Sequence, residues 1–203
     1  MSEQLSVSQP QYRIVVERHL PAKMRDGITL YADAHRPDAP GTFPVILMRV
    51  PYDKAAATPL NYVNYFVPRG YVVAVQDTRG RYTSEGEYYP LIHEAEDGYD
   101  TVEWAAKLPW SEGKVGTAGQ SYHGATQNLL PHTRPPHLVC QVPISASANF
   151  HASWVYHTGG AFEFGWQVAY TIFMARNTAE RLGLGPAYVE KLDRYVAPGV
   201  NFA

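Results

Sequence analysis

The stretch that decides the fold reads Val115-Gly116-Thr117-Ala118-Gly119-Gln120-Ser121-Tyr122-His123-Gly124. A short strand-like run leads into Gly119, Ser121 follows two residues later, and a helix is expected to begin directly after it. Such a sharp turn lifts the serine hydroxyl into the crevice at the carboxyl end of a sheet, and the flanking glycines relieve the crowding of the strained backbone. Such a turn is compatible with a serine nucleophile, and it would direct the backbone N–H of Tyr122 at a developing oxyanion.

The same stretch departs from the usual nucleophile turn at one position. That turn has glycine two residues after the serine, whereas this chain has His123 there and Gly124 one residue later. A serine that only caps the N-terminus of a helix would give the same pattern. Taken alone, the segment leaves both interpretations open.

A tyrosine lies where a second oxyanion donor is expected. Pro51-Tyr52-Asp53-Lys54 follows directly after the continuous apolar run 44–50, which is typical of a buried strand. In an α/β-hydrolase, the loop after the third strand supplies the other oxyanion donor. The phenolic hydroxyl of Tyr52 could fill that role; the alternative is an ordinary loop residue, one of 15 tyrosines.

Strand and helix patterns alternate between residues 44 and 142. Apolar or β-rich runs predict strands at 14–17, 28–32, 44–50, 71–76, 114–118 and 138–142. Helical spacing predicts helices at 60–68, 94–107 and 122–130. Glu94, Glu96 and Asp97 are expected to stabilise the N-terminus of the second helix. The alternation predicts an α/β fold, with a mostly parallel sheet and helices on both faces.

The pattern changes after about residue 150. Aromatic residues crowd into a segment of mainly helical character, which continues to about residue 195. We therefore expect two parts. Residues 1–149 form the N-terminal part of a catalytic α/β domain, and residues 150–203 begin a separate helical subdomain.

Composition and charge exclude several function classes. The 203 residues carry a net charge of −2 without a basic stripe, so nucleic acid is not an expected partner. Apolar runs reach only strand length, so no membrane span is expected. The N-terminus is polar and lacks a signal pattern, so we expect the chain to be cytoplasmic. No spacing typical of metal ligands or of a phosphate-binding loop occurs, so we expect no metal and no cofactor.

The chain has one cysteine, Cys140, which lies in the apolar run 138–142. A thiol within a buried strand packs as a small apolar group and is chemically inert. We therefore expect Cys140 to be structural and not a nucleophile.

Several motifs occur in unbroken order between about residues 13 and 166. They are Arg25-Asp26-Gly27, Pro51-Tyr52-Asp53-Lys54, Gln76-Asp77-Thr78-Arg79-Gly80, Ser84-Glu85-Gly86, Glu96-Asp97-Gly98-Tyr99-Asp100, Pro109-Trp110 and Gly119-Gln120-Ser121-Tyr122-His123-Gly124. Together they resemble the X-Pro dipeptidyl-peptidase and cocaine-esterase family, which also includes the α-amino-acid ester hydrolases. That family tolerates glycine three residues after the serine.

The resemblance implies a fold and a set of roles. It implies an α/β-hydrolase fold, truncated here, in which the stretch from about residue 150 begins a helical cap over the active site. Ser121 would be the acylated nucleophile, and the Tyr52 hydroxyl and the Tyr122 N–H would form the oxyanion hole. Asp77, at the end of a predicted strand, would brace a loop through an Asp–Arg contact.

The resemblance also implies that the catalytic set is incomplete within these residues. In this fold the acid and the histidine follow the serine in chain order, both after the cap, so they are expected beyond Ala203. His123 lies in the turn itself, and its side chain is expected to point away from the Ser121 hydroxyl. Four side chains of the cap segment are candidates for the substrate pocket: His151, Trp154, His157 and Trp166.

Two functions are compatible with these residues. The first is a hydrolase that cleaves a small-molecule ester or a peptide through an acyl-enzyme. The second is a catalytically inactive fragment or pseudoenzyme, which lacks the triad acid and histidine and only binds. Because the sheet edge and the aromatic cap face would be uncovered, self-association into a homo-oligomer is also expected.

Ester cleavage is slightly favoured over release of a dipeptide. An exopeptidase of this family recognises a free amine through acidic groups, and Glu163 is a candidate for that role. A glutamate on the surface of a helix is the simpler interpretation of Glu163. The motifs also resemble the shorter, cocaine-esterase-like members of the family.

Overall fold

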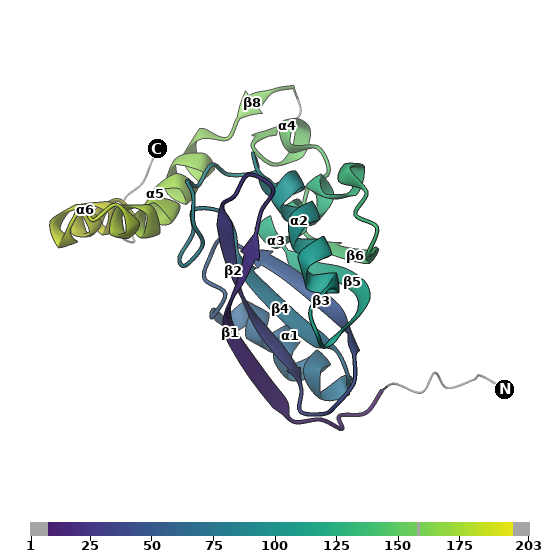
Figure 1. The fold of residues 1–203 in the computed structure, drawn as a ribbon. Coiled ribbons are helices and arrows are strands. Elements are labelled where there is room, and N and C mark those ends of the chain that lie inside the picture. Colours follow the sequence, from purple (N-terminus) through teal and green to yellow (C-terminus); the bar gives the residue numbers. More distant parts are fainter. Residues whose placement is uncertain (1–7, 158, 197–203) are drawn as a thin grey trace.

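The structure, a computed structural model, describes residues 8–157 and 159–196. A six-stranded sheet with the order β1-β2-β4-β3-β5-β6 lies at its centre (Figure 1). The strands are β1 (Ile14–Lys23), β2 (Thr29–Pro37), β3 (Phe43–Val50), β4 (Val72–Asp77), β5 (Ser111–Gln120) and β6 (Leu138–Ile144). β1 and β2 are antiparallel to their neighbours, and β4, β3, β5 and β6 are mutually parallel. The prediction of a mostly parallel α/β sheet is confirmed.

β1 continues six residues past its predicted end at Glu17, to Lys23. Its pairing with β2 shifts register between Glu17 and Leu20, and His19 in this bulge has φ 57°. A bulge inserts an extra residue and interrupts the alternation of side chains along a strand. The periodicity by which the strand was predicted therefore stops at the bulge, although the strand itself does not.

Helices connect the parallel strands. α1 (Ala57–Phe66) and a 3₁₀ turn (Val67–Arg69) join β3 to β4, and α2 (Glu94–Ala106) joins β4 to β5. α3 (Tyr122–Leu129) and a second 3₁₀ turn (Pro131–Thr133) join β5 to β6. Each predicted helix of this part is present, with its ends shifted by three residues or fewer.

Alternate residues of β4 show how the layers form. Val73 and Val75 pack in a cluster with residues of α1, whereas Val72 and Ala74 pack in a second cluster with residues of α2. All four side chains are fully buried. Because successive side chains of a strand point to opposite faces, α1 covers one face of the sheet and α2 covers the other. The predicted helices on both faces are therefore confirmed.

The expectation for the strand at 138–142 is wrong in one respect. β6 forms at the predicted place, but Val139 and Val142 are 58% and 52% exposed, and Cys140 is exposed too. β6 is the last strand of the sheet, and among the described residues none pairs with its outer edge. The prediction that the Cys140 thiol is buried, and inert for that reason, is therefore wrong about its burial.

The segment after residue 149 contains α4 (Phe150–Ser153), α5 (Phe164–Arg181) and α6 (Pro186–Val196). Figure 1 shows it at one end of the sheet, coloured green to yellow. A short hairpin of β7 (Tyr156–His157) and β8 (Ala161–Phe162) lies between α4 and α5 and was not predicted. Its sequence signal is Gly159-Gly160, both with positive φ, 92° and 81°, because tight turns favour glycine at such angles.

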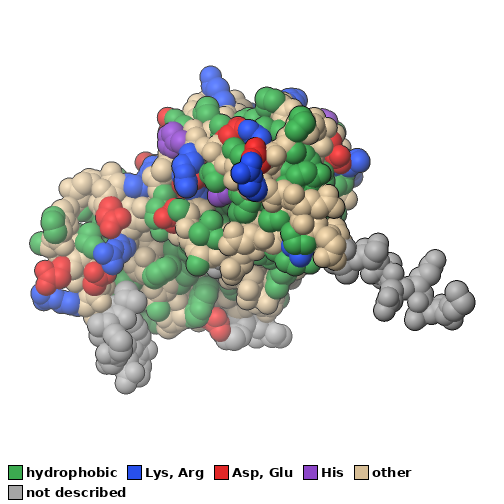
Figure 2. All heavy atoms as spheres, turned by 90° about the horizontal axis from the view of Figure 1, so that it is seen from below, with side chains coloured by type: hydrophobic (Ala, Val, Ile, Leu, Met, Phe, Trp, Pro, Cys, Tyr) green, Lys and Arg blue, Asp and Glu red, His purple; other side chains and the backbone are tan. Residues whose placement is uncertain are grey.

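The surface carries charges of both signs. On the face shown in Figure 2, basic and acidic side chains are interspersed, without a continuous area of either sign. Within residues 8–157 and 159–196, no helix combines the length and apolar character that a membrane crossing requires.

Two glycines allow the packing of α3 to be tested. A Cβ on Gly124 would lie 2.5 Å from the Ala146 Cβ and 3.1 Å from the Ile144 carbonyl oxygen, whereas a Cβ on Gly165 meets nothing within 4 Å. Gly124→Ala should lower the free energy of unfolding by about 1–3 kcal/mol, because the backbone must move to relieve the overlap. Gly165→Ala, in α5, is the control and should leave it unchanged or raise it by up to about 1 kcal/mol. Urea unfolding measures both, and equal losses would contradict the packing described here.

Candidate active site

Ser121 lies where β5 ends and α3 begins, and its backbone is strained. Its angles are φ 59° and ψ −121°, a region that residues other than glycine rarely adopt. The Ser121 N–H donates to the carbonyl oxygen of Ile144 in β6 at 2.9 Å. The side chain is half-buried and makes no capping hydrogen bond to α3. The helix-cap interpretation of this serine therefore finds no support in the structure.

The glycines on both sides are required by close packing. Gly119 has φ 146°, and a Cβ there would lie 2.4 Å from the Cβ of His123. Gly124 packs against Ala146 and Ile144, which follow and end β6. Glycine is therefore needed two residues before and three residues after Ser121. This geometry explains why the motif has its second glycine at 124, and we call residues 119–124 the serine turn.

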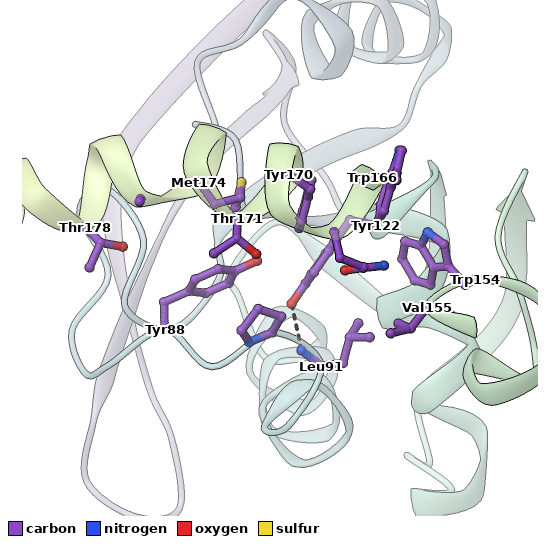
Figure 3. Close-up of a pocket in the computed structure, with 13 residues that line it drawn as sticks. Tyr88, Leu91, Tyr122, Trp154, Val155, Trp166, Tyr170, Thr171, Met174 and Thr178 are labelled. Atoms are coloured by element: carbon purple, nitrogen blue, oxygen red, sulfur yellow. Dashed lines mark hydrogen bonds between the residues drawn. The ribbon is translucent and has the colours of Figure 1, made fainter. Parts of the chain in front are cut away.

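Tyr122 is locked into the core next to Ser121. Its side chain is 1% exposed, and its hydroxyl donates to Glu94 Oε1 at 2.9 Å and accepts from the Leu91 N–H at 2.9 Å. Figure 3 shows the Tyr122 ring reaching toward Leu91. As the first residue of α3, Tyr122 has no partner for its own N–H within the helix. That N–H is therefore available to an acceptor beside Ser121.

Two of the acidic residues in the first turn of α2 form buried contacts with arginines. Glu94 is buried and forms an ion pair with Arg49 of β3, with Nη1 and Oε2 2.9 Å apart. Asp97 is also buried and accepts from Arg79 Nε at 2.9 Å, whereas Glu96 is exposed. Glu94 thus connects Arg49 to the Tyr122 hydroxyl. This buried network ties the serine turn to the middle of the sheet.

Tyr52 lies in the loop after β3, which we call the Tyr52 loop (residues 51–56). Lys54 anchors this loop to Asp77 at the end of β4: its N–H donates to Oδ1 at 2.8 Å, and its Nζ lies 3.1 Å from Oδ2. Asp77 therefore braces a loop, as expected, but its cationic partner is Lys54 and not an arginine. Arg79 binds Asp97 and Asp26 instead.

The Tyr52 side chain lies beside the serine turn. Its ring centroid is 5.5 Å from that of His123 and 6.4 Å from that of Tyr122. Its hydroxyl oxygen is 3.3 Å from the hydroxyl oxygen of Tyr170 in α5. Burial raises the pKa of Tyr52 well above its ordinary value, so the phenol keeps its proton at neutral pH. The structure thus brings the predicted residues Tyr52, Ser121 and Tyr122 together.

The His123 side chain is buried in the core. Its side chain is 5% exposed, and neither ring nitrogen has a hydrogen-bond partner among the described residues. Burial lowers its pKa to about 4, because the charged form would lose its hydration. His123 is therefore a neutral core residue.

A cavity of about 320 Å³ adjoins this arrangement. Trp154 and Trp166, both predicted pocket residues, line it together with Tyr88, Pro90, Leu91, Tyr122, Val155, Gln167, Tyr170, Thr171, Met174, Ala175 and Thr178. Ser121 and Tyr52 are not among the lining residues, but the neighbours Tyr122 and Tyr170 are. The cavity therefore contacts Tyr122 itself and borders Tyr52 only through Tyr170.

Of the two histidines predicted for the pocket, His151 lies elsewhere and His157 stays a prediction. His151 does not line the cavity, because its ring stacks on Tyr156 of the hairpin at 4.8 Å. The side chain of His157 lies outside the described part of the structure. Sequence reasoning missed Tyr88 and Tyr170, which come from different segments and share no motif. Within the described residues, no group of three or more His, Cys, Asp and Glu is arranged to hold a metal ion.

The buried, neutral His123 predicts a pH dependence of stability. Its folded-state pKa of about 4 lies below the usual value of 6.5, so its contribution is fully present above about pH 6.5 and is lost as the pH falls toward 4. Between these limits the free energy of unfolding should fall by up to about 3 kcal/mol. Urea unfolding at several pH values measures this loss.

Two variants isolate the contribution of His123. His123→Leu should remove this part of the pH dependence, since leucine is apolar and does not titrate. His151→Gln, at an exposed position, should retain it. Parallel loss of stability in the wild type and His123→Leu would contradict the assignment.

Comparison with known proteins agrees with this geometry. Residues 26–199 match the family described as X-Pro dipeptidyl-peptidase (S15 family). Cocaine esterase from Rhodococcus sp. is 42% identical over 142 residues, which cover 68% of this chain and 25% of that protein. A CocE/NonD family hydrolase from Staphylococcus aureus superposes with a TM-score of 0.73 at 31% identity, over 81% of this chain and 34% of that one.

An α-amino acid ester hydrolase superposes with a TM-score of 0.63 at 29% identity, over 79% of this chain and 30% of its own. The chain thus spans about a quarter to a third of the length of these relatives. The match to the S15 family, the identity to cocaine esterase and the shared fold all indicate the same family. The chain belongs to the X-Pro dipeptidyl-peptidase (S15) family and has its α/β-hydrolase fold.

Proposed function

We propose that the protein is a serine hydrolase that forms an acyl-enzyme on Ser121. The observation that carries the proposal is the strained backbone of Ser121 at the end of β5, with the Tyr52 ring packed against the serine turn. Strain of this kind persists only where the surrounding structure enforces it, and it is concentrated at functional sites. The family relatives named as esterases and dipeptidyl-peptidases support the same reaction class.

The proposed reaction has two halves. The Ser121 Oγ attacks the substrate carbonyl carbon and gives its proton to a general base, and the carbonyl oxygen becomes an oxyanion. The Tyr52 hydroxyl and the Tyr122 N–H donate hydrogen bonds to that oxyanion. The intermediate collapses, the alcohol leaves with the proton from the base, and water then hydrolyses the acyl-Ser121 ester by the same steps.

The general base is proposed to come from a later part of the polypeptide. In this fold the acid and the histidine of the triad follow the serine in chain order. His123 does not suit the role, because it is buried and its pKa is lowered to about 4. Nothing in the comparisons supports the alternative of a chain that only binds.

The cavity supports an ester with an apolar or aromatic acyl group as the substrate. No side chain that lines it is charged, and its walls include two tryptophans and three tyrosines. A dipeptidyl-peptidase must compensate a substrate ammonium group, and burying such a charge without an acidic partner is costly. Glu163 does not line the cavity, and the buried Glu94 is already paired with Arg49 and Tyr122. We therefore favour esterase over exopeptidase activity.

Labelling tests the nucleophile. In the full-length protein, a fluorophosphonate probe should modify Ser121, and Ser121→Ala should abolish both labelling and hydrolysis of p-nitrophenyl acetate. The control is Ser153→Ala, an exposed serine of α4, which should behave as wild type. Hydrolysis that survives in Ser121→Ala would refute the assignment, and mass spectrometry of the labelled peptide identifies the modified residue.

Removal of one hydroxyl tests the oxyanion hole. Tyr52→Phe keeps the ring and should lower kcat by about 10²- to 10³-fold with little change in KM, because the lost hydrogen bond forms in the transition state. Tyr188→Phe, at an exposed tyrosine of α6, should leave both constants unchanged. A wild-type kcat in Tyr52→Phe would show that another group completes the oxyanion hole.

A further inference from the structure

We propose that Tyr170, in α5, is a positioning residue for the Tyr52 hydroxyl: it donates a hydrogen bond to the Tyr52 oxygen and leaves the Tyr52 proton free for the oxyanion. The inference rests on the proposed function and deepens it. The two hydroxyl oxygens lie 3.3 Å apart, and geometry alone allows either to be the donor. A phenol has one proton, so if Tyr52 donates to the oxyanion, Tyr170 must donate to Tyr52.

The backbone around this pair is held by one arginine. Arg81, only 2% exposed, donates from Nε to the Pro51 carbonyl oxygen at 2.8 Å and from Nη1 to the Met174 carbonyl oxygen at 2.9 Å. Pro51 precedes Tyr52, and Met174 lies about one helical turn after Tyr170. The Arg81 contacts and the Tyr52–Tyr170 contact therefore connect the Tyr52 loop and α5 at two points. The distance between the two hydroxyls is set by the anchored backbone as well as by the side chains.

α5 and the Tyr170 ring are held by further contacts. The side-chain oxygen of Asn177 accepts a hydrogen bond from the Tyr82 N–H at 3.0 Å. Trp166 stacks on Tyr170 with ring centroids 5.1 Å apart and an interplanar angle of 4°. Figure 3 shows both rings on the side of α5 that faces the cavity. The Tyr170 hydroxyl is thus presented to Tyr52 by a fixed helix and a stacked ring.

Both tyrosines carry the proton that a chain of donors requires. Burial raises the pKa of Tyr170 and of Tyr52 well above the ordinary value, so each carries its proton at neutral pH. In the sequence Tyr170 to Tyr52 to oxyanion, each hydrogen bond polarises the next and strengthens it. Tyr170 then acts only through Tyr52, and it does not touch the reacting atoms.

A double-mutant cycle in the full-length protein tests this. Tyr170→Phe should lower kcat about 3- to 10-fold, the effect of one neutral hydrogen bond, with KM changed less than about twofold. In the Tyr52→Phe background the same substitution should cause no further loss, because the group through which Tyr170 acts is gone. Tyr188→Phe is the matched control in both backgrounds, and urea unfolding verifies that every variant is folded.

The outcomes separate the two proposals. If Tyr52→Phe lowers kcat but Tyr170→Phe has no effect, has the same effect in both backgrounds, or raises KM alone, the positioning role is wrong and the oxyanion assignment stands. If Tyr52→Phe itself retains the wild-type kcat, the oxyanion assignment fails and the positioning role fails with it. Labelling of Ser121 by the fluorophosphonate reports on the nucleophile independently of both.

Discussion

The arrangement of this protein depends on the strained backbone of Ser121. A non-glycine residue at φ 59° and ψ −121° costs about 1–3 kcal/mol, and the surrounding contacts must offset that cost. Ser121 is held to β6 through Ile144, and the next residue, Tyr122, is buried and hydrogen-bonded at its hydroxyl to Glu94 and Leu91. These contacts come from β6, α2 and the loop before α2, so the turn exists only in the assembled sheet.

Two buried ion pairs extend this constraint to the neighbouring strands. The Arg49–Glu94 ion pair holds α2 against β3. The Lys54–Asp77 ion pair holds the Tyr52 loop against the end of β4. A buried pair adds little net stability, but loss of one partner leaves an uncompensated charge and costs about 3–5 kcal/mol. We interpret these residues as structural supports for Tyr52 and Tyr122, the proposed oxyanion donors.

α5 adds the third constraint, because it joins the Tyr52 loop to an apolar cavity. Arg81 binds carbonyl oxygens on both sides, and Tyr170 lines the cavity while its hydroxyl contacts Tyr52. The position of α5 and the position of Tyr52, the proposed oxyanion donor, are therefore mechanically linked. The uncharged aromatic lining of the cavity is the feature on which the proposal of an ester substrate rests.

Local chemistry determined the strands, the helices and the serine turn, because periodicity and glycine spacing are properties of neighbouring residues. The motif Pro51-Tyr52-Asp53-Lys54 likewise placed Tyr52 in the loop after β3, because it directly follows the apolar run of that strand. Tertiary structure alone decided what crosses between segments. It paired Asp77 with Lys54 and not with an arginine, exposed Cys140 on an edge strand, and set Tyr170 against Tyr52. Such partners are chosen by packing between residues that are distant in sequence, and no local pattern encodes that choice.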